Sequence, residues 1–301
     1  MAERERDEVT GTETTGHEWD GIKELDTPLP RWWLWTFYGT IVWGLIYIIL
    51  YPAIPLVHTN TKGVLGTTNR AELIRELEKV KQARAEKLAQ LDKLSMEEIW
   101  KNDELRQFAI RMGEAAFKVN CVVCHQAGGQ GALGYPNLAD DEWIWGGTLD
   151  AIHYTITHGI RYNPDTNEDT RQSEMPAFGE QLTPEQIDAV SEYVLKLAGY
   201  EHDAKKAEEG KQIFAEEAGC NGCHGENGEG IADVGGPPLN NKIWLYGYGF
   251  ETDAGKIKTM IMNQVRLPRH GVMPAWKGRL DEATIKALTA YVFSLGGGVG
   301  S

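Results

Sequence analysis

The sequence has little positive charge and few cysteines. Its 30 Lys and Arg residues are outnumbered by 44 Asp and Glu residues, which gives a formal net charge of −14. This balance argues against a nucleic-acid partner, because phosphate binding requires a basic face, and suits a basic protein partner or simple solubility. Hydrophobic residues make up 42% and charged residues 25% of the chain, so the composition is not that of a disordered protein. The length of 301 residues suggests about two domains.

One segment lacks charge altogether. No Asp, Glu, Lys or Arg occurs between Trp32 and Tyr51, and about twenty residues with a rise of about 1.5 Å each cover roughly 30 Å, the thickness of a bilayer core. Tryptophans gather at its start and tyrosines near its end, as in aromatic belts. The run is too long for a signal peptide, follows an acidic region and precedes no small-residue cleavage site. We therefore predict a retained transmembrane helix over residues 31–57.

The segments on either side of this helix are polar. Residues 1–30 are acidic and predict a mobile tail. Residues 58–107 are rich in Glu, Lys, Arg, Ala and Leu, and Leu73, Leu77 and Val80 recur at helical spacing. They predict an amphipathic helix or helix pair that separates the anchor from a globular part. Basic residues lie on both sides of the apolar segment, so the positive-inside rule does not orient it.

The rest of the chain is an internal repeat. The first copy covers residues 108–200 and the second covers residues 208–299. Each copy contains Gly-x-x-x-Phe, Cys-x-x-Cys-His, Met-Pro and a closing apolar segment in the same order. A motif that is repeated together with all its surroundings predicts two small domains of one type.

All four cysteines belong to two Cys-x-x-Cys-His motifs. The motifs are Cys121, Cys124 and His125, and Cys220, Cys223 and His224. This spacing is the attachment signature of c-type haem, because the two thiols reach two vinyl groups on one edge of the porphyrin while the adjacent histidine lies under the iron. We predict two covalently bound haem c groups.

A methionine followed by proline occurs at the same place in both copies. Met175 follows His125 by 50 residues, and Met273 follows His224 by 49. Because proline fixes the local backbone, each thioether is predicted to be the second axial ligand of an iron. Methionine ligation raises the reduction potential and closes the iron to other ligands, which is typical of electron carriers. The unrepeated Met112, Met260 and Met262 are predicted to pack in helices.

The Cys-x-x-Cys spacing by itself also allows two other roles for the cysteines, a zinc site and a dithiol redox centre. A single four-cysteine zinc site would join pairs about a hundred residues apart, wider than a zinc ribbon, and would leave the histidines and the Met-Pro pairs unexplained. A dithiol redox centre would require a thioredoxin-like βαβ unit, which the pattern does not contain. Neither explains the repeat.

Other polar residues lie on the approach to each Met-Pro. His153, His158 and His270 do not recur in both copies, so they are surface histidines or, for His158 and His270, partners of a haem propionate. Arg161 and Arg266 occupy similar places in the two copies and would suit a propionate as well.

The repeat is similar to the class I cytochrome c fold, whose first and last helices cross beside the haem. Gly113 and Gly210 begin helices and are each followed by a phenylalanine, while Tyr193 and Tyr291 lie on the last helix of each copy. A glycine allows two helices to cross closely while an aromatic ring fills the crossing. The predicted fold is mainly α, with one transmembrane helix plus two tandem class I cytochrome c domains.

The layout as a whole resembles the CcoP/FixP family, the dihaem subunits of cbb3-type cytochrome c oxidases. It shares the acidic tail, the Trp-rich anchor, the charged spacer and the two cytochrome c domains, as well as CVVCH followed by the glycine-rich QAGGQGALGYPNL. The resemblance implies a subunit that takes electrons from a soluble c-type cytochrome. It would pass them to a monohaem subunit and a haem–copper subunit, where oxygen is reduced and protons are pumped. The chain itself would transfer electrons only and contain no catalytic residue.

The resemblance also implies how the ligands are paired and on which side of the membrane they lie. His125 would pair with Met273 and His224 with Met175, whereas the sequence alone favours pairing within each copy. Haem attachment outside the cytoplasmic membrane implies a cytoplasmic N-terminal tail and periplasmic haem domains on a bacterial inner membrane. Independently of the resemblance, the excess of acidic residues in the first copy makes it the better candidate for docking a basic cytochrome, with a plain solvated surface as the alternative.

Two alternative functions stay open at this point. One is a free-standing, membrane-anchored dihaem electron shuttle with the same sites and no stable complex. The other is a dihaem peroxidase, which requires an iron with an open position and is disfavoured by the repeated Met-Pro.

Overall fold

The computed structural model describes residues 5–247 and 253–297. The chain packs as two units, Met1–Ala83 and Arg84–Ser301, and the boundary falls within the long helix α2 (Asn69–Lys93).

The N-terminal unit begins with a β-hairpin. Strands β1 (Thr14–Trp19) and β2 (Ile22–Leu25) pair antiparallel, with Trp19 opposite Ile22. Asp20 and Gly21 form the two-residue turn with φ of 46° and 84°, and Asp-Gly is a preferred pair for such a turn because both positions require positive φ. The prediction of a mobile tail over residues 1–30 is therefore wrong for this stretch, and the Asp-Gly signal was present in the sequence.

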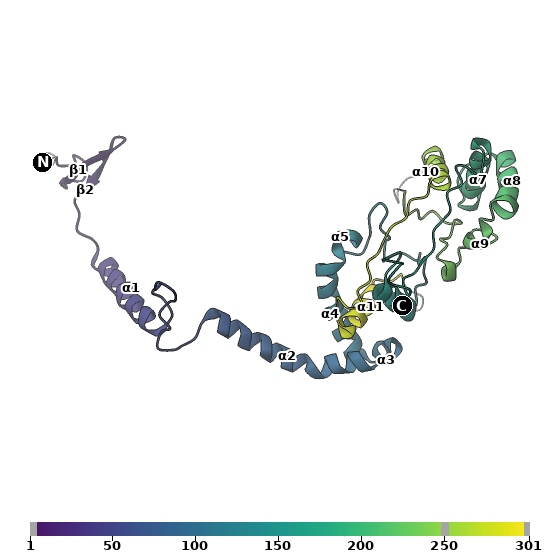
Figure 1. The fold of residues 1–301 in the computed structure, drawn as a ribbon. Helices are drawn as coiled ribbons and strands as arrows, with labels where there is room; N and C mark the ends of the chain where they lie inside the picture. The colour runs from purple at the N-terminus through teal and green to yellow at the C-terminus, as the bar shows by residue number, and fades with distance from the viewer. Residues whose placement is uncertain (1–4, 248–252, 298–301) are drawn as a thin grey trace. The chain divides into compact units, whose positions relative to one another are not determined.

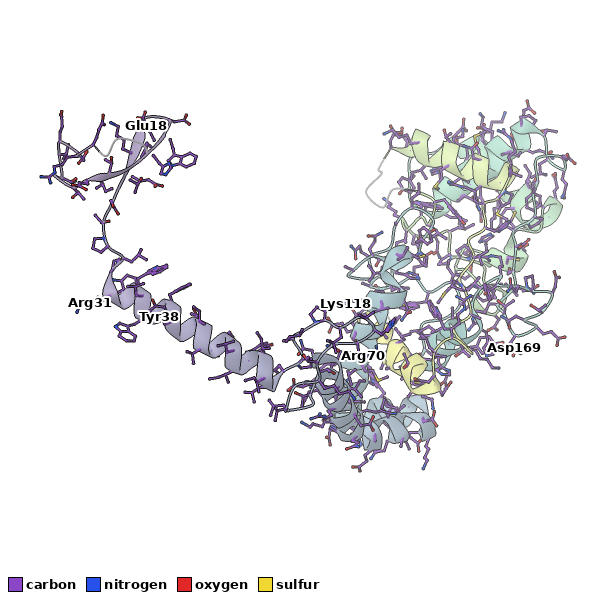
Figure 2. The ribbon with its side chains drawn as sticks, turned by 60° about the vertical axis from the view of Figure 1, so that its left-hand side comes forward. Glu18, Arg31, Tyr38, Arg70, Lys118 and Asp169 are labelled. Atoms are coloured by element: carbon purple, nitrogen blue, oxygen red, sulfur yellow. The ribbon has the colours of Figure 1, made fainter. Side chains whose placement is uncertain are left out.

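Helix α1 (Arg31–Leu50) is the one helix among the described residues that is long and apolar enough to cross a membrane. None of its residues is buried by the rest of the protein, and its side chains point outward all around it (Figure 2). The following loop folds back on its end: the amide of Val64 donates to the carbonyl of Ile49 (2.9 Å), and that of Leu65 to the carbonyl of Leu50 (3.1 Å). These bonds satisfy carbonyls that the helix itself leaves free. The helix is shorter than the predicted span of 31–57.

The C-terminal unit is helical, as the sequence predicts. In order, it contains α3 (Met96–Lys101), α4 (Asp103–Asn120), α5 (Val122–His125), α6 (Leu149–His158), α7 (Pro184–Leu197), α8 (Ala204–Gln212), the π-helical turn η1 (Ile213–Glu217), α9 (Asn221–His224), the 3₁₀ turn η2 (Ala232–Val234), α10 (Ala254–Arg266) and α11 (Glu282–Phe293). The predicted boundary at residue 107 falls inside α4, because this helix begins at its Asn102 cap. Gly113 and Gly210 lie inside helices rather than at their starts.

The helices form two lobes that exchange parts of the two sequence copies. In the first lobe, α4 packs against α11, together with α3, α5 and α6; in the second, α7 packs against α8 and α10, together with η1 and α9 (Figure 1). Each copy thus contributes its first helix to one lobe and its last helix to the other. The expected crossing of the first and last helices of one copy does not occur.

The glycine and aromatic residues predicted to lie where two helices cross nevertheless do so, at crossings between helices of different copies. A Cβ added at Gly113 would lie 2.0 Å from the carbonyl oxygen of Ala287, and one at Gly210 would lie 2.0 Å from that of Ala189. The ring centroids of Phe117 and Tyr291 are 5.2 Å apart, and those of Phe214 and Tyr193 are 5.3 Å apart. Because the two copies are similar in sequence, exchanging their last helices replaces each helix contact by an equivalent one, at little cost in free energy.

A nearly buried charge cluster ties the helices of the second lobe together. The ammonium of Lys258 on α10 lies 2.5 Å from Asp188 and 2.6 Å from Glu192, both on α7. The side chain of Glu192 is only 8% exposed, and Lys206 on α8 is also paired with Asp188, at 2.6 Å. A charge buried to this degree is stable only with its partner.

Replacing Lys258 by Met should lower the free energy of unfolding by about 2–3 kcal/mol, because it leaves Glu192 buried without a counter-charge in a site that water still partly reaches. Thermal unfolding of the purified full-length protein measures this. The control is Lys205→Met at an exposed position of α8, which removes the same charge and is expected to change stability by less than about 0.5 kcal/mol. Equal effects of the two variants would contradict the role of the cluster.

Candidate functional site

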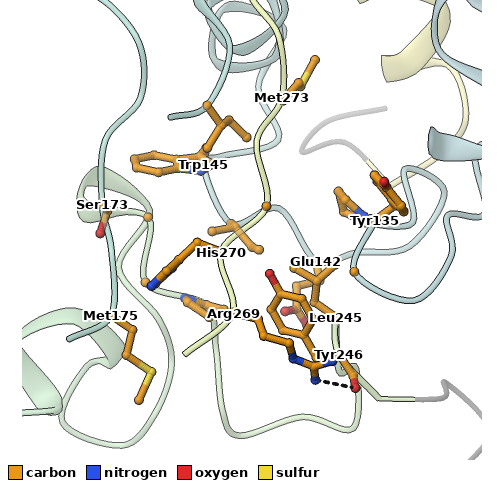
Figure 3. Close-up of a pocket in the computed structure, with 18 of the residues that line it drawn as sticks. Tyr135, Glu142, Trp145, Ser173, Met175, Leu245, Tyr246, Arg269, His270 and Met273 are labelled. Atoms are coloured by element: carbon orange, nitrogen blue, oxygen red, sulfur yellow. Dashed lines mark hydrogen bonds between the residues drawn. The ribbon is translucent and has the colours of Figure 1, made fainter. Parts of the chain in front are cut away.

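A cavity of about 480 Å³ runs through both lobes of the C-terminal unit (Figure 3). It is lined by every residue that the sequence predicts to hold haem: Cys121, Cys124, His125, Met175, Cys220, Cys223, His224 and Met273. Most of its remaining lining is apolar or aromatic, including Phe117, Phe214, Trp145 and Trp244. The structure therefore brings the two motifs and the two Met-Pro segments to one continuous space.

A single helical turn presents each Cys-x-x-Cys-His motif. The amides of His125 and His224 donate to the carbonyls of Cys121 and Cys220, each at 2.9 Å. The turns end at Gln126 and Gly225, which have φ of 63° and 81°. The same backbone geometry thus positions two thiols and one imidazole in both copies.

The first cysteine of each motif is unsuited to thiol redox chemistry. Burial, together with the neighbouring cysteine, raises the pKa of the Cys121 thiol to about 11, and burial raises that of Cys220 to about 11. A reactive cysteine requires a lowered pKa. Within residues 5–247 and 253–297, no three His, Cys, Asp or Glu side chains are grouped as a site for a metal ion, so the two cysteine pairs do not meet in a four-thiolate site.

Each motif histidine is fixed by a prolyl carbonyl. Nδ1 of His125 donates to the carbonyl of Pro136 (3.1 Å), and Nδ1 of His224 donates to that of Pro237 (2.8 Å). Burial lowers the pKa of both imidazoles, more than the bond to the carbonyl raises it. A neutral ring whose Nδ1 proton is engaged leaves the Nε2 lone pair for a metal. The residues present therefore fit an axial histidine of haem in each lobe.

Each methionine lies in the lobe of the other copy's motif. Met273 packs in the apolar cluster that contains Phe117 and is bordered by Cys121, whereas Met175 packs in the cluster of Phe214, bordered by Cys220. Figure 3 shows the two methionines on separate segments at different ends of the cavity. This placement brings Met273 to the lobe of the first motif and Met175 to the lobe of the second, the arrangement that the resemblance implies.

The other predicted residues divide between the cavity and the surface. Of the unrepeated methionines, Met260 also lines the cavity. His153 bonds Glu282 at 3.0 Å, and His158 lies 3.5 Å from Asp169, whereas His270 lines the cavity (Figure 3). Arg161 lines the cavity as well, and Arg266 does not.

Two polar residues of the cavity were not expected from the sequence. The guanidinium of Arg269 lies over the ring of Tyr246, 4.4 Å from its centroid, and donates to the Tyr246 carbonyl at 3.3 Å (Figure 3). Burial raises the pKa of the Glu142 carboxyl to about 7, although Nδ2 of Asn241 donates to it at 2.7 Å. Neither residue belongs to a repeated motif, so the sequence offered no signal for them.

Comparison with known proteins agrees with the site. Residues 11–58 match the family described as the N-terminal domain of cytochrome oxidase-cbb3, FixP, and residues 110–198 and 207–296 each match cytochrome c. The Rhizobium leguminosarum bv. viciae cbb3-type cytochrome c oxidase subunit FixPc is 50% identical over 298 residues, which cover 99% of this chain and 100% of that protein. This chain belongs to the CcoP/FixP family of cbb3-type cytochrome c oxidase subunits.

Other members of the CcoP/FixP family match at similar levels. Subunit CcoP of Cereibacter sphaeroides is 48% identical over 287 residues, 95% of each chain. Subunit CcoP of Azospirillum brasilense is 46% identical over 304 aligned positions, which cover 99% of this chain and all of that protein. The chain is thus an electron-transfer subunit of an oxidase complex, with two cytochrome c domains and a membrane anchor.

Proposed function

We propose that this CcoP/FixP-family chain is the electron-input subunit of a cbb3-type cytochrome c oxidase. It takes electrons from a soluble c-type cytochrome and delivers them to the monohaem subunit, from which they reach the haem–copper subunit that reduces oxygen and pumps protons. The proposal rests above all on the two matching sets of Cys, Cys, His and Met around one cavity, in which each histidine bonds a carbonyl through Nδ1 and has no hydrogen bond to Nε2 from the described residues. The chain transfers electrons and does not itself reduce oxygen.

Each set of residues has a defined role in this proposal. The two cysteines of each motif would hold one haem c covalently, with His125 and Met273 as its iron ligands in the first lobe and His224 and Met175 in the second. Haem c supplies one-electron exchange at its iron. The apolar lining excludes water, and the thioethers close the second axial position, so the site favours electron transfer over peroxide chemistry.

The anchor sets the orientation of the chain. Helix α1 crosses the bacterial inner membrane once, with the hairpin on the cytoplasmic side and the haem lobes in the periplasm, where covalent haem attachment takes place. Exposed acidic residues of the first copy, such as Asp141, Asp165 and Glu168, steer a basic donor cytochrome, since complementary charge raises the rate of encounter.

The decisive experiment is purification through a tag on this chain from membranes dissolved in mild detergent. Copper, b-type haem and oxygen uptake with reduced cytochrome c should all follow the tag. Recovery of c-type haem alone, with an intact low-spin spectrum, would instead identify a free-standing anchored electron shuttle. A high-spin haem in the same preparation would favour a peroxidase.

A further inference from the structure

One arginine joins the two segments that carry the methionines. Nε of Arg161 donates to the carbonyl of Gly271 (2.7 Å), and its Nη1 donates to the carbonyl of Ser173 (2.8 Å). Each of these carbonyls belongs to the residue two positions before a cavity methionine, Met273 and Met175 respectively. A single guanidinium thus bridges two loops that serve different lobes.

The backbone holds this arginine firmly in place. The residue before it, Ile160, exchanges two backbone hydrogen bonds with Met273, at 2.9 and 3.0 Å, and the Arg161 amide donates to the carbonyl of Arg171 at 2.8 Å. Arg161 itself adopts a φ of 50°, which is uncommon for a residue with a side chain. Such strain persists where the surroundings fix the backbone, and it is often associated with function.

The two methionine loops depend on Arg161 to different degrees. Met273 is held directly by its two backbone bonds to Ile160. In residues 172–176, the bond from Arg161 to Ser173 is the only hydrogen bond to another segment within the described part of the chain. Ser173 and Met175 follow one another along this stretch at the edge of the cavity (Figure 3). The position of Met175 is therefore more sensitive to Arg161 than that of Met273.

We propose that Arg161 is a positioning residue that clamps both methionine loops, and that the Met175 loop in particular is held at the cavity by it. The inference rests on the proposed axial roles of the two methionines. The planar guanidinium presents several N–H donors in a rigid fork, so it can serve two carbonyls at fixed angles. A lysine ammonium offers no such geometry, and neutral glutamine offers neither the reach nor the charge.

The test compares Arg161→Gln and Arg161→Lys in the full-length protein loaded with haem. The readouts are the far-red charge-transfer absorption of methionine-ligated ferric haem, carbon monoxide binding by the reduced protein, and the reduction potentials. Hydrogen bonds to a charged group contribute enough that their loss should raise the methionine-free population at the second lobe about 10- to 100-fold. Arg161→Lys should show a smaller change of the same kind, and it remains informative if Arg161→Gln does not accumulate.

The matched control is Arg171→Lys. Arg171 is also half-buried, but its guanidinium donates to Thr155 and Ala151, both on α6, and to neither methionine loop. The Arg171→Lys variant should leave the far-red absorption of methionine-ligated ferric haem unchanged. Repeating Arg161→Gln together with Met175→Leu, and separately with Met273→Leu, assigns the effect to one lobe.

Three outcomes separate the hypotheses. A larger loss at the second lobe, with Arg171→Lys unchanged, supports the clamp. Unchanged spectra in both Arg161 variants, or equal changes in Arg171→Lys, overturn it. A native protein without any methionine-ligated haem would instead contradict the proposed axial ligands, which is a separate failure.

Discussion

Replacing Met273 by Leu is expected to open the iron of the first lobe and to leave that of the second unchanged. Leucine nearly conserves the volume, so the packing cost should stay below about 1.5 kcal/mol, while the thioether is lost. The reduced protein should then bind carbon monoxide at one of its two irons. The reduction potential of that iron should fall by a sizeable part of the roughly 0.8 V range over which axial ligands act. Met262→Leu is the control, because Met262 lies on α10 and does not line the cavity.

The same substitution distinguishes exchanged from local pairing. In protein whose first motif cannot hold haem (Cys121→Ala with Cys124→Ala), Met273→Leu should leave the spectrum of the remaining haem unchanged. In protein whose second motif is disabled (Cys220→Ala with Cys223→Ala), it should remove the methionine signature. The opposite pattern would mean that Met273 serves the motif of its own copy and would refute the pairing of His125 with Met273.

Replacing Gly210 by Ala should strongly destabilise the second lobe. The added Cβ would lie 2.0 Å from the carbonyl oxygen of Ala189, so the backbones of α8 and α7 would have to move apart. Overpacking against backbone rather than a flexible side chain should cost about 3 kcal/mol or more. The midpoint of thermal unfolding would then fall by about 6–12 °C in a unit of this size. Thermal unfolding of the full-length protein in detergent, followed through haem-region circular dichroism, measures the change.

The neighbouring substitution Glu209→Ala provides the control for Gly210→Ala. Glu209 is exposed on the same helix, so its replacement should change the unfolding midpoint by little. The destabilisation by Gly210→Ala should also appear as faster proteolysis of α7, a helix from the first sequence copy, because α7 and α8 pack together. Protection of α7 with loss of α11 instead would show that α8 packs within its own copy.

Strong local signals determined much of this protein from the sequence alone. The charge-free run predicted α1, because only a long apolar helix suits a bilayer. The repeated Cys-x-x-Cys-His and Met-Pro motifs predicted eight residues that all line the cavity, because thiol attachment and iron ligation restrict residue type and spacing. The Asp20-Gly21 turn is an equally local signal, although the acidic composition around it favours a mobile tail instead of the hairpin that forms.

Only the tertiary structure decided whether the first helix of each copy packs against the last helix of its own copy or of the other copy. A helix crossing within one copy and a crossing between the two copies would both suit Gly113, Gly210 and their accompanying aromatic residues, since the two copies present similar surfaces. The choice depends on the paths of residues 159–183 and 267–281, which contain no helix or strand and whose course is set by long-range bonds such as those between Ile160 and Met273. Arg161 was expected at the haem site, but its bond to Gly271 and the bond between Glu142 and Asn241 were not predicted, for the same reason: these partners lie about a hundred residues apart in the sequence, a distance that no spacing or periodicity encodes.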